Sequence, residues 1–189
     1  MLLLTYRVGV NKDHCTKKKA MNLRLEKLYK ENRQIMDSLV GLEIKSATEE
    51  QYFFEGKLDK ESRGTLKLEF SNGQEIYINC DIDAESLKIQ KEGFSNKGTL
   101  ETDFEDERYK WREKQYLSKE ELQPLGQIEK AEIEILTREH QRIQSGCRIS
   151  FQNGNFLHIW TTPSDNIFYE INQEPNCYQN QKVNVELKK

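Results

Sequence analysis

A short phrase occurs twice in this sequence, as FSNGQEIYI at residues 70–78 and as FQNGNFLHI at residues 151–159. In each copy an Asn-Gly pair separates two runs in which apolar and polar residues alternate, which is typical of a β-hairpin. The copies are displaced by 81 residues, from Phe70 to Phe151. Because the same order of strand, hairpin and strand occurs in both halves, the sequence predicts an internal duplication.

The length of the hairpin loop decides which face the apolar residues share. A two-residue loop at Asn72-Gly73 would divide them between opposite faces of the sheet. A three-residue loop with Gly73 at the left-handed position of a G1 bulge pairs Leu68 with Ile76 and keeps them on one face. The second copy leads to the same choice, so we predict a structural role in turns, with positive φ at both glycines, for Asn72, Gly73, Asn153 and Gly154.

The rest of the chain predicts mostly strands with two helices. Residues 22–36 have the apolar spacing of an amphipathic helix, with Asn22 as its N-cap. The S-x-x-E pattern at residues 118–121 is a capping box that opens a short second helix, and Pro124 and Gly126 should end it. The predicted fold class is α+β, with a mainly antiparallel sheet built from two related β-meander units, an N-terminal amphipathic helix and a short second helix.

We divide the chain into four segments. Residues 1–20 are a leader that we expect to be disordered or accessory, and residues 21–98 are a first helix-plus-β unit. Residues 99–126 are a charged insertion with the short helix. Residues 127–189 are a second β unit that shares one core with the first.

Composition excludes several classes of function. A formal net charge of -3 gives no general attraction for phosphate backbones, so we expect no nucleic-acid partner. The apolar run in MLLLTYRVGV is too short to span a membrane and lacks a preceding charge, so we expect a cytoplasmic protein without a membrane partner. The four cysteines are scattered without a C-x-x-C pair, and we expect neither a metal nor a cofactor.

The motifs of common catalytic sites are missing. The sequence contains no G-x-S-x-G, S-x-x-K or H-E-x-x-H pattern. His158 should lie opposite Arg148 on the face away from the core, as an exposed cross-strand residue. We therefore expect no catalytic residues, and the alternative is a small enzyme whose site combines His158, Tyr169 and Glu170.

A charged stretch with aromatic neighbours is the candidate partner-binding surface. Its acidic part is either a solvated loop or a surface that docks on a basic partner. Its aromatic residues either anchor an interface or pack on the sheet. The same two alternatives apply to Tyr116, which follows them in the sequence. The candidate residues are Glu101, Asp103, Glu105, Asp106, Glu107, Tyr109 and Trp111.

A chain with an N-terminal amphipathic helix, F-x-N-G hairpins and no catalytic constellation resembles the immunity proteins of bacterial polymorphic and contact-dependent toxin systems. The likeness is carried by residues 70–78 and 151–159, and it extends over about half of the chain. The smallest members of this class have a single copy of the unit. The resemblance implies that the protein binds a cognate toxin, blocks its active site and has no turnover of its own. The missing secretion signal implies a toxin that acts in the cytosol, and an adaptor or chaperone for a secreted effector is the alternative.

Overall fold

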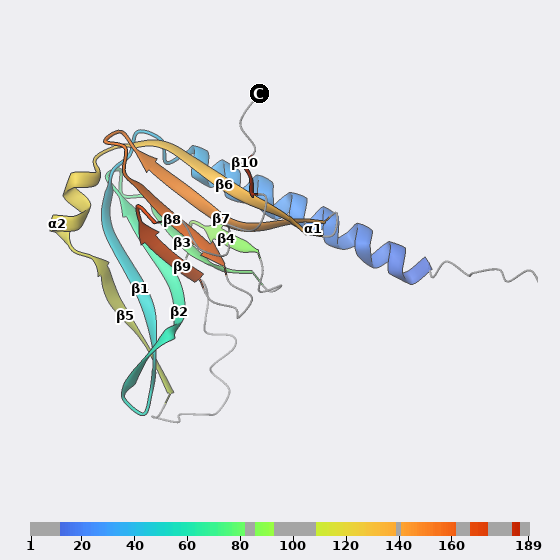
Figure 1. The fold of residues 1–189 in the computed structure, drawn as a ribbon, viewed down its shortest axis with the longest axis horizontal. Coiled ribbons are helices and arrows are strands. Elements are labelled where there is room, and N and C mark those ends of the chain that lie inside the picture. Colours follow the sequence, from blue (N-terminus) through green and yellow to red (C-terminus); the bar gives the residue numbers. More distant parts are fainter. Residues whose placement is uncertain are drawn as a thin grey trace, which may run out of the picture.

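The computed structural model describes residues 12–81, 86–92, 109–138, 141–161, 167–173 and 183–185. Two five-stranded antiparallel sheets face each other, and a long helix runs beside them (Figure 1). The α+β prediction is therefore confirmed. The elements of the first half are α1 (Lys12–Asp37), β1 (Ile44–Phe54), β2 (Lys57–Phe70), β3 (Glu75–Cys80), β4 (Leu87–Gln90) and β5 (Tyr109–Leu117). Those of the second half are α2 (Lys119–Leu122), the 3-10 turn η2 (Gln123–Leu125), β6 (Ile128–Arg138), β7 (Gln141–Phe151), β8 (Phe156–Thr161), β9 (Ile167–Ile171) and β10 (Val183–Val185).

The two sheets have the same topology. The first has the strand order β4-β3-β2-β1-β5 and the second, read from its other edge, has β9-β8-β7-β6-β10. In both, four strands form a meander and the fifth strand returns to pair with the first. A helix also precedes each meander, α1 in the first unit and α2 in the second. The similarity between the two copies of the repeated phrase therefore extends to the topology of whole five-stranded units.

The repeated hairpins have the predicted register. Leu68 pairs with Ile76 in the first copy, and Ile149 pairs with Leu157 in the second. The φ angles of Gly73 and Gly154 are 79° and 86°, in the left-handed region. Each glycine N–H donates to the carbonyl of the phenylalanine three residues before it, over 2.9 Å in both copies. The two glycines therefore adopt the left-handed conformation that a three-residue loop with a G1 bulge requires.

The inner faces of the sheets pack on each other. Their buried apolar side chains form a single cluster, which contains both phenylalanines of the repeated phrase and also Met36 and Leu39 from the end of α1 and the turn after it. The units are also joined through the backbone, because Ile128 N–H donates to the Leu42 carbonyl and Gly41 N–H donates to the Ile128 carbonyl, each over 2.8 Å.

Helix α1 closes the edge of the first sheet. Asn32 is fully buried, its amide nitrogen donates to the Leu87 carbonyl over 2.7 Å, and its amide oxygen accepts from Ile89 N–H over 2.9 Å. One side chain thus takes the place of a neighbouring strand at β4. The helix begins at Lys12, so the prediction of Asn22 as its N-cap is wrong. No glycine or proline occurs between Lys12 and Asn22, and nothing in that stretch ends the helix.

The structure also shows the second helix and part of the segment that precedes it. Ser118 and Glu121 form the predicted capping box at the start of α2. Residues 109–117, inside the segment expected to be a charged insertion, form β5 and pair with β1 from Phe54 to Ala47. That part of the segment is therefore an edge strand of the first sheet. Residues 1–11 of the expected leader lie outside the described residues.

Candidate functional site: a projecting arm with exposed aromatic side chains

The β1–β2 hairpin and the start of β5 project beyond the second sheet (Figure 1). We call residues 50–63 and 109–114 the arm. At its tip Phe54 pairs with Lys57 across a two-residue turn, in which Glu55 and Gly56 have φ angles of 49° and 76°. Positive φ at both central residues is the type I′ geometry that matches the twist of the two strands. The arm is therefore an ordered three-stranded extension of the sheet.

The outer face of the arm, which points away from the second sheet, exposes aromatic rings. Phe54 is 42% exposed and Trp111 is 41% exposed. Trp111 pairs with Tyr52 across the strands, and their ring centroids lie 5.2 Å apart. About two-fifths of the surface of both Phe54 and Trp111 remains open to solvent, so the surface is available for another molecule.

Gly64 lets the Trp111 ring lie close to the backbone of β2. A Cβ atom at Gly64 would come within 2.8 Å of Trp111 Cζ3 and 2.9 Å of Glu50 Cβ. Real Cβ atoms do not approach other atoms so closely, and the neighbours would have to move. The glycine therefore sets where the indole lies.

We expect Gly64→Ala to displace the Trp111 ring and to lower the free energy of unfolding by about 1–3 kcal/mol, as other overpacking substitutions do. Denaturant unfolding measures the loss of stability, and the indole N–H resonance of Trp111 reports the displacement. A variant with unchanged stability and an unshifted Trp111 resonance would contradict this packing. The indole resonance of Trp160, which lies in the second sheet, is the internal control.

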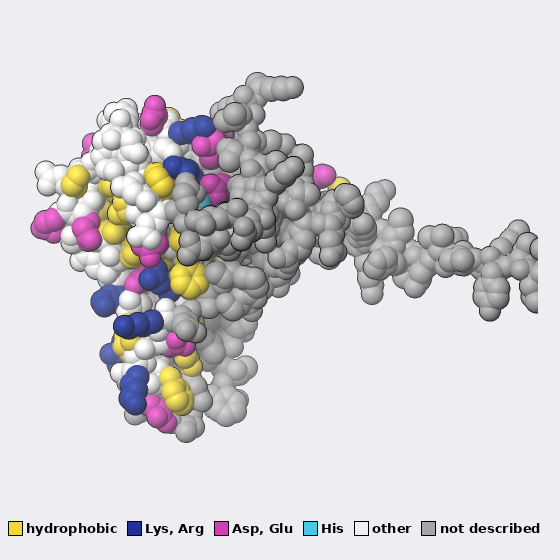
Figure 2. All heavy atoms as spheres, in the orientation of Figure 1, with side chains coloured by type: hydrophobic (Ala, Val, Ile, Leu, Met, Phe, Trp, Pro, Cys, Tyr) yellow, Lys and Arg dark blue, Asp and Glu magenta, His cyan; other side chains and the backbone are white. Residues whose placement is uncertain are grey.

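The inner face of the arm, which is continuous with the core side of the first sheet, is cationic. The Arg112 guanidinium carbon lies 4.9 Å from the centre of the Phe53 ring, and Leu58, opposite Phe53, is 37% exposed. The Arg63 guanidinium lies 5.0 Å from the Tyr169 ring centre, on β9 of the other sheet. Figure 2 shows Lys and Arg side chains gathered over β5 and the arm, with apolar side chains among them. The arm thus combines aromatic rings with arginines.

Only part of the predicted partner-binding set can be placed. Glu101, Asp103, Glu105, Asp106 and Glu107 lie outside the described residues, and Tyr109 is the first residue of β5. Trp111 is exposed on the arm, whereas the ring of Tyr116 packs edge-on against Tyr169 at 4.4 Å between centroids. The sequence did not indicate that the strand containing Tyr52, Phe53 and Phe54 pairs with the strand containing Trp111. The Glu-Gly pair after Phe54 was the available signal of a hairpin there.

A buried polar group joins the two sheets at the base of the arm. Glu49 of β1 accepts hydrogen bonds from the Tyr169 hydroxyl and from the Gln51 amide. The Tyr116 hydroxyl donates to the Tyr169 carbonyl over 3.0 Å. Burial raises the pKa of Tyr169 well above its usual value near 10, and the hydrogen bond to Glu49 raises it further. The neutral phenol is therefore the form that the folded protein holds.

The raised pKa of Tyr169 predicts loss of stability at alkaline pH. In the unfolded chain the phenol loses its proton near pH 10, whereas the folded protein keeps it, so the stability present below that pH decreases as pH rises. This tyrosine should contribute a slope of about -1.4 kcal/mol per pH unit above pH 10. Urea unfolding at a series of pH values should give a shallower slope for Tyr169→Phe than for the wild type. Equal slopes would contradict the assignment.

His158 is buried, and the prediction that it is an exposed cross-strand residue is wrong. It does pair with Arg148, but it is only 1% exposed, and its Nε2 lies 2.6 Å from Glu134 Oε2. The reason is Gly146, which pairs with Glu134 of β6 and has no side chain to separate the carboxylate from the imidazole. Trp160 adds to the enclosure, with its ring centroid 5.4 Å from that of His158.

The alternative enzyme site brings together only two of its three residues, His158 and Glu170. His158 pairs with Glu170, and Ile159 pairs with Tyr169. Successive residues of a strand point to opposite faces, so Tyr169 faces the core while His158 and Glu170 face the other side of the second sheet. The full burial of Tyr169 also withholds its hydroxyl from a substrate.

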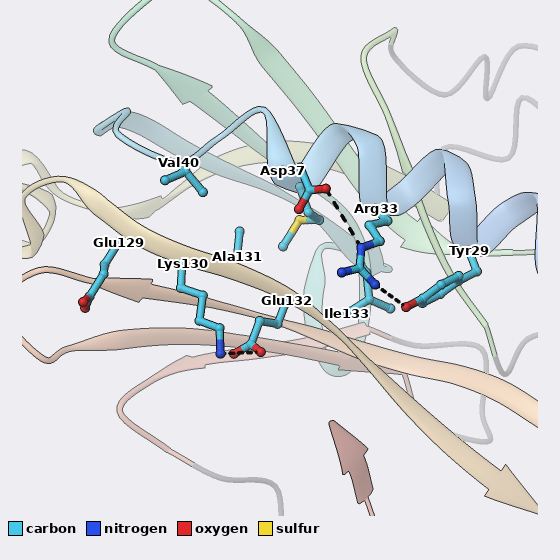
Figure 3. A pocket seen from close by; sticks show the side chains of 10 residues that line it. Tyr29, Arg33, Asp37, Val40, Glu129, Lys130, Ala131, Glu132 and Ile133 are labelled. Atoms are coloured by element: carbon cyan, nitrogen blue, oxygen red, sulfur yellow. Dashed lines mark hydrogen bonds and ion pairs between the residues drawn. The ribbon is translucent and has the colours of Figure 1, made fainter. Parts of the chain in front are cut away.

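A groove of about 230 Å³ lies between α1 and β6 (Figure 3). Arg33 Nη1 donates to the Tyr29 hydroxyl over 2.8 Å, and Lys130 Nζ lies 2.6 Å from Glu132 Oε1. Its lining contains no histidine, cysteine or serine. The charged groups of the groove thus interact with one another, and the arm remains the better candidate site.

Three further observations bear on function. Among the described residues, no group of three or more His, Cys, Asp or Glu side chains is arranged to hold a metal ion. Within the same ranges, none of the helices combines the length and apolarity needed to cross a membrane. No protein-family model matches the sequence, and neither a curated protein nor a solved structure is significantly similar to it.

Proposed function

We propose that this chain is an immunity protein that neutralises a cognate cytosol-acting bacterial toxin, by inserting the arm into the toxin and blocking its active site. The observation that carries the proposal is that three exposed apolar side chains lie on one projecting hairpin and its neighbouring strand, Phe54 and Trp111 on the outer face and Leu58 on the inner face. Large aromatic residues and arginine are the residue types that dominate binding energy at protein interfaces. The arm presents both.

The shape of the arm supports inhibition by blockage. Within the arm, β1 pairs with β5 in unbroken register up to Phe54, and it pairs with β2 at Gln51 and at the tip across a register shift. This pairing limits the conformational entropy that is lost when the arm binds. A projecting element of this kind fits a concave surface, and active sites are usually concave. The binding residues need no chemistry of their own, because occupation of the cleft is sufficient for inhibition.

The proposal is tested by capture followed by a toxicity assay. A photo-crosslinking amino acid at position 54, introduced into the full chain in its native cells, should join the arm to the partner. The captured protein is then expressed alone and together with this chain. The proposal requires that the partner alone stops growth and that co-expression restores growth. A partner that is harmless, or that is equally toxic with and without this chain, would exclude the function.

The same assay separates an adaptor or chaperone from an immunity protein. An adaptor binds its effector without abolishing the effector's activity. The purified complex should therefore be inactive if this chain is an immunity protein, and it should retain activity if the chain carries an effector for export.

A further inference from the structure

The inner face of the arm has a row of three polar side chains across three strands. Gln51 of β1 pairs with Arg63 of β2 on one side and with Arg112 of β5 on the other. Adjacent strands lie about 4.8 Å apart, so the two arginines are separated by about 10 Å at their Cα atoms. We call these three residues the arginine row. We propose that the arginine row binds an extended acidic segment of the partner protein, an inference that rests on the proposed function and names the chemistry of the partner.

The arginines of the row are oriented by aromatic rings. Arg112 lies over Phe53, and Arg63 lies over Tyr169 and, at 5.6 Å, over Phe168. Stacking holds the plane of a guanidinium while its N–H groups point outward along that plane. Neither arginine forms an ion pair with a carboxylate in the part of the chain that the structure describes. The row therefore presents two arginines that are already oriented for a planar acidic group.

Two atoms of the row lack a hydrogen-bond partner within the described part of the chain. They are Arg63 Nη1, a donor, and Gln51 Oε1, an acceptor, and both are buried. Buried polar atoms are almost always paired, so both side chains gain a hydrogen bond if they turn toward a ligand that supplies an acceptor and a donor. The nearest carboxylate on the same face of β1 is that of Glu49, and it already accepts hydrogen bonds from Gln51 and Tyr169.

A peptide segment supplies both groups. An aspartate or glutamate side chain offers a carboxylate, which a guanidinium binds through two parallel hydrogen bonds. The backbone N–H of the same segment offers the donor that Gln51 Oε1 lacks. A nucleic-acid phosphate offers acceptors only, which would leave Gln51 unsatisfied. Lys114, exposed two residues after Arg112 on β5, adds a further positive charge for an acidic partner.

The test uses the full chain and a defined probe, a decapeptide in which glutamate and valine alternate. In nuclear magnetic resonance titrations, the side-chain Nε resonances of Arg63 and Arg112 should shift, and affinity should decrease as salt is added. We expect Arg112→Glu to weaken peptide binding at least about tenfold. Arg112→Lys, which keeps the charge but loses the planar fork, should weaken it by less than Arg112→Glu.

The matched control is Lys119→Glu, an equal charge change at an exposed residue of α2 away from the arm. It should leave peptide affinity within about twofold of wild type. The inference is overturned if neither arginine shifts at millimolar peptide, or if Arg112→Glu binds as well as wild type. It is equally overturned if a single-stranded RNA decamer binds the row more tightly than the peptide does, because the partner would then be a nucleic acid.

The failure of this inference differs from the failure of the proposed function. If the peptide binds the arginine row but the captured partner remains toxic during co-expression, the immunity function is excluded. The binding of an acidic segment by the arginine row is then still supported. In the opposite case, the wild-type chain and the Arg112→Glu variant protect cells equally and the peptide does not bind. The immunity function is then supported, and the binding of an acidic segment by the arginine row is excluded.

Discussion

Under the proposed function, replacing Trp111 by alanine should remove protection against the toxin without unfolding the protein. The indole is exposed at the centre of the outer face of the arm, beside Tyr52 and close to the tip residue Phe54. Truncating a central aromatic anchor at an interface typically costs 2 kcal/mol or more of binding free energy, so the affinity for the toxin should decrease at least about 30-fold. Phe54→Ala should have an effect of the same order. Calorimetric titration with the purified toxin measures both.

The chain offers matched controls for this experiment. Leu23 and Val40 are also large, apolar and exposed, at 59% and 52%, but they lie on α1 and just after it. Leu23→Ala and Val40→Ala should bind the toxin as tightly as wild type. Equal losses from all four substitutions would mean that the arm has no special role. Unchanged binding of Trp111→Ala and Phe54→Ala would place the interface elsewhere on the molecule.

Replacing Asn32 by leucine should cause the largest loss of stability. Leucine has the same number of side-chain heavy atoms and the same branching as asparagine, but it cannot hydrogen bond with the Leu87 carbonyl or with Ile89 N–H, and both would be left unsatisfied beside a buried residue. Each unsatisfied buried group costs about 1–3 kcal/mol, so the loss of two should lower the free energy of unfolding by about 2–6 kcal/mol. For a chain of this length the middle of that range corresponds to a melting temperature lower by about 10 °C.

Gln34→Leu is the control for Asn32→Leu. It makes a comparable change from amide to leucine on the same helix, at an exposed position two residues later. It should change stability by less than about 0.5 kcal/mol. Thermal unfolding followed by circular dichroism measures both variants. If the two destabilise equally, the amide bridge between α1 and β4 has no energetic role.

Local signals were sufficient for the parts of the fold that depend on neighbours in sequence. The F-x-N-G turns follow from which residues must share a face, and the capping box follows from two residues three positions apart. The duplication followed from comparing two such local patterns. These predictions needed no knowledge of which distant segments meet.

Three features that the sequence did not reveal depend on distant neighbours. The arm requires β5 to pair with β1, and nothing in residues 109–117 indicates that partner. His158 was expected to be exposed because Arg148 is its cross-strand neighbour, yet its environment is set by Gly146 and Glu134 on two other strands. The role of Asn32 likewise depends on β4, which lies 55 residues away along the chain. Pairing between strands remote in sequence is decided by packing of the whole core, which single-sequence patterns do not contain.

The arm also determines how this protein can evolve. Its exposed residues lie outside the cluster of buried side chains that both units share, so a substitution at Phe54, Leu58 or Trp111 changes the contact surface while the core stays intact. Surface substitutions of this kind usually alter stability by less than about 0.5 kcal/mol. Mutations that change the choice of partner are therefore nearly neutral for folding. Under the proposed function, the choice of partner can therefore change through the arm alone while the two-sheet scaffold stays the same.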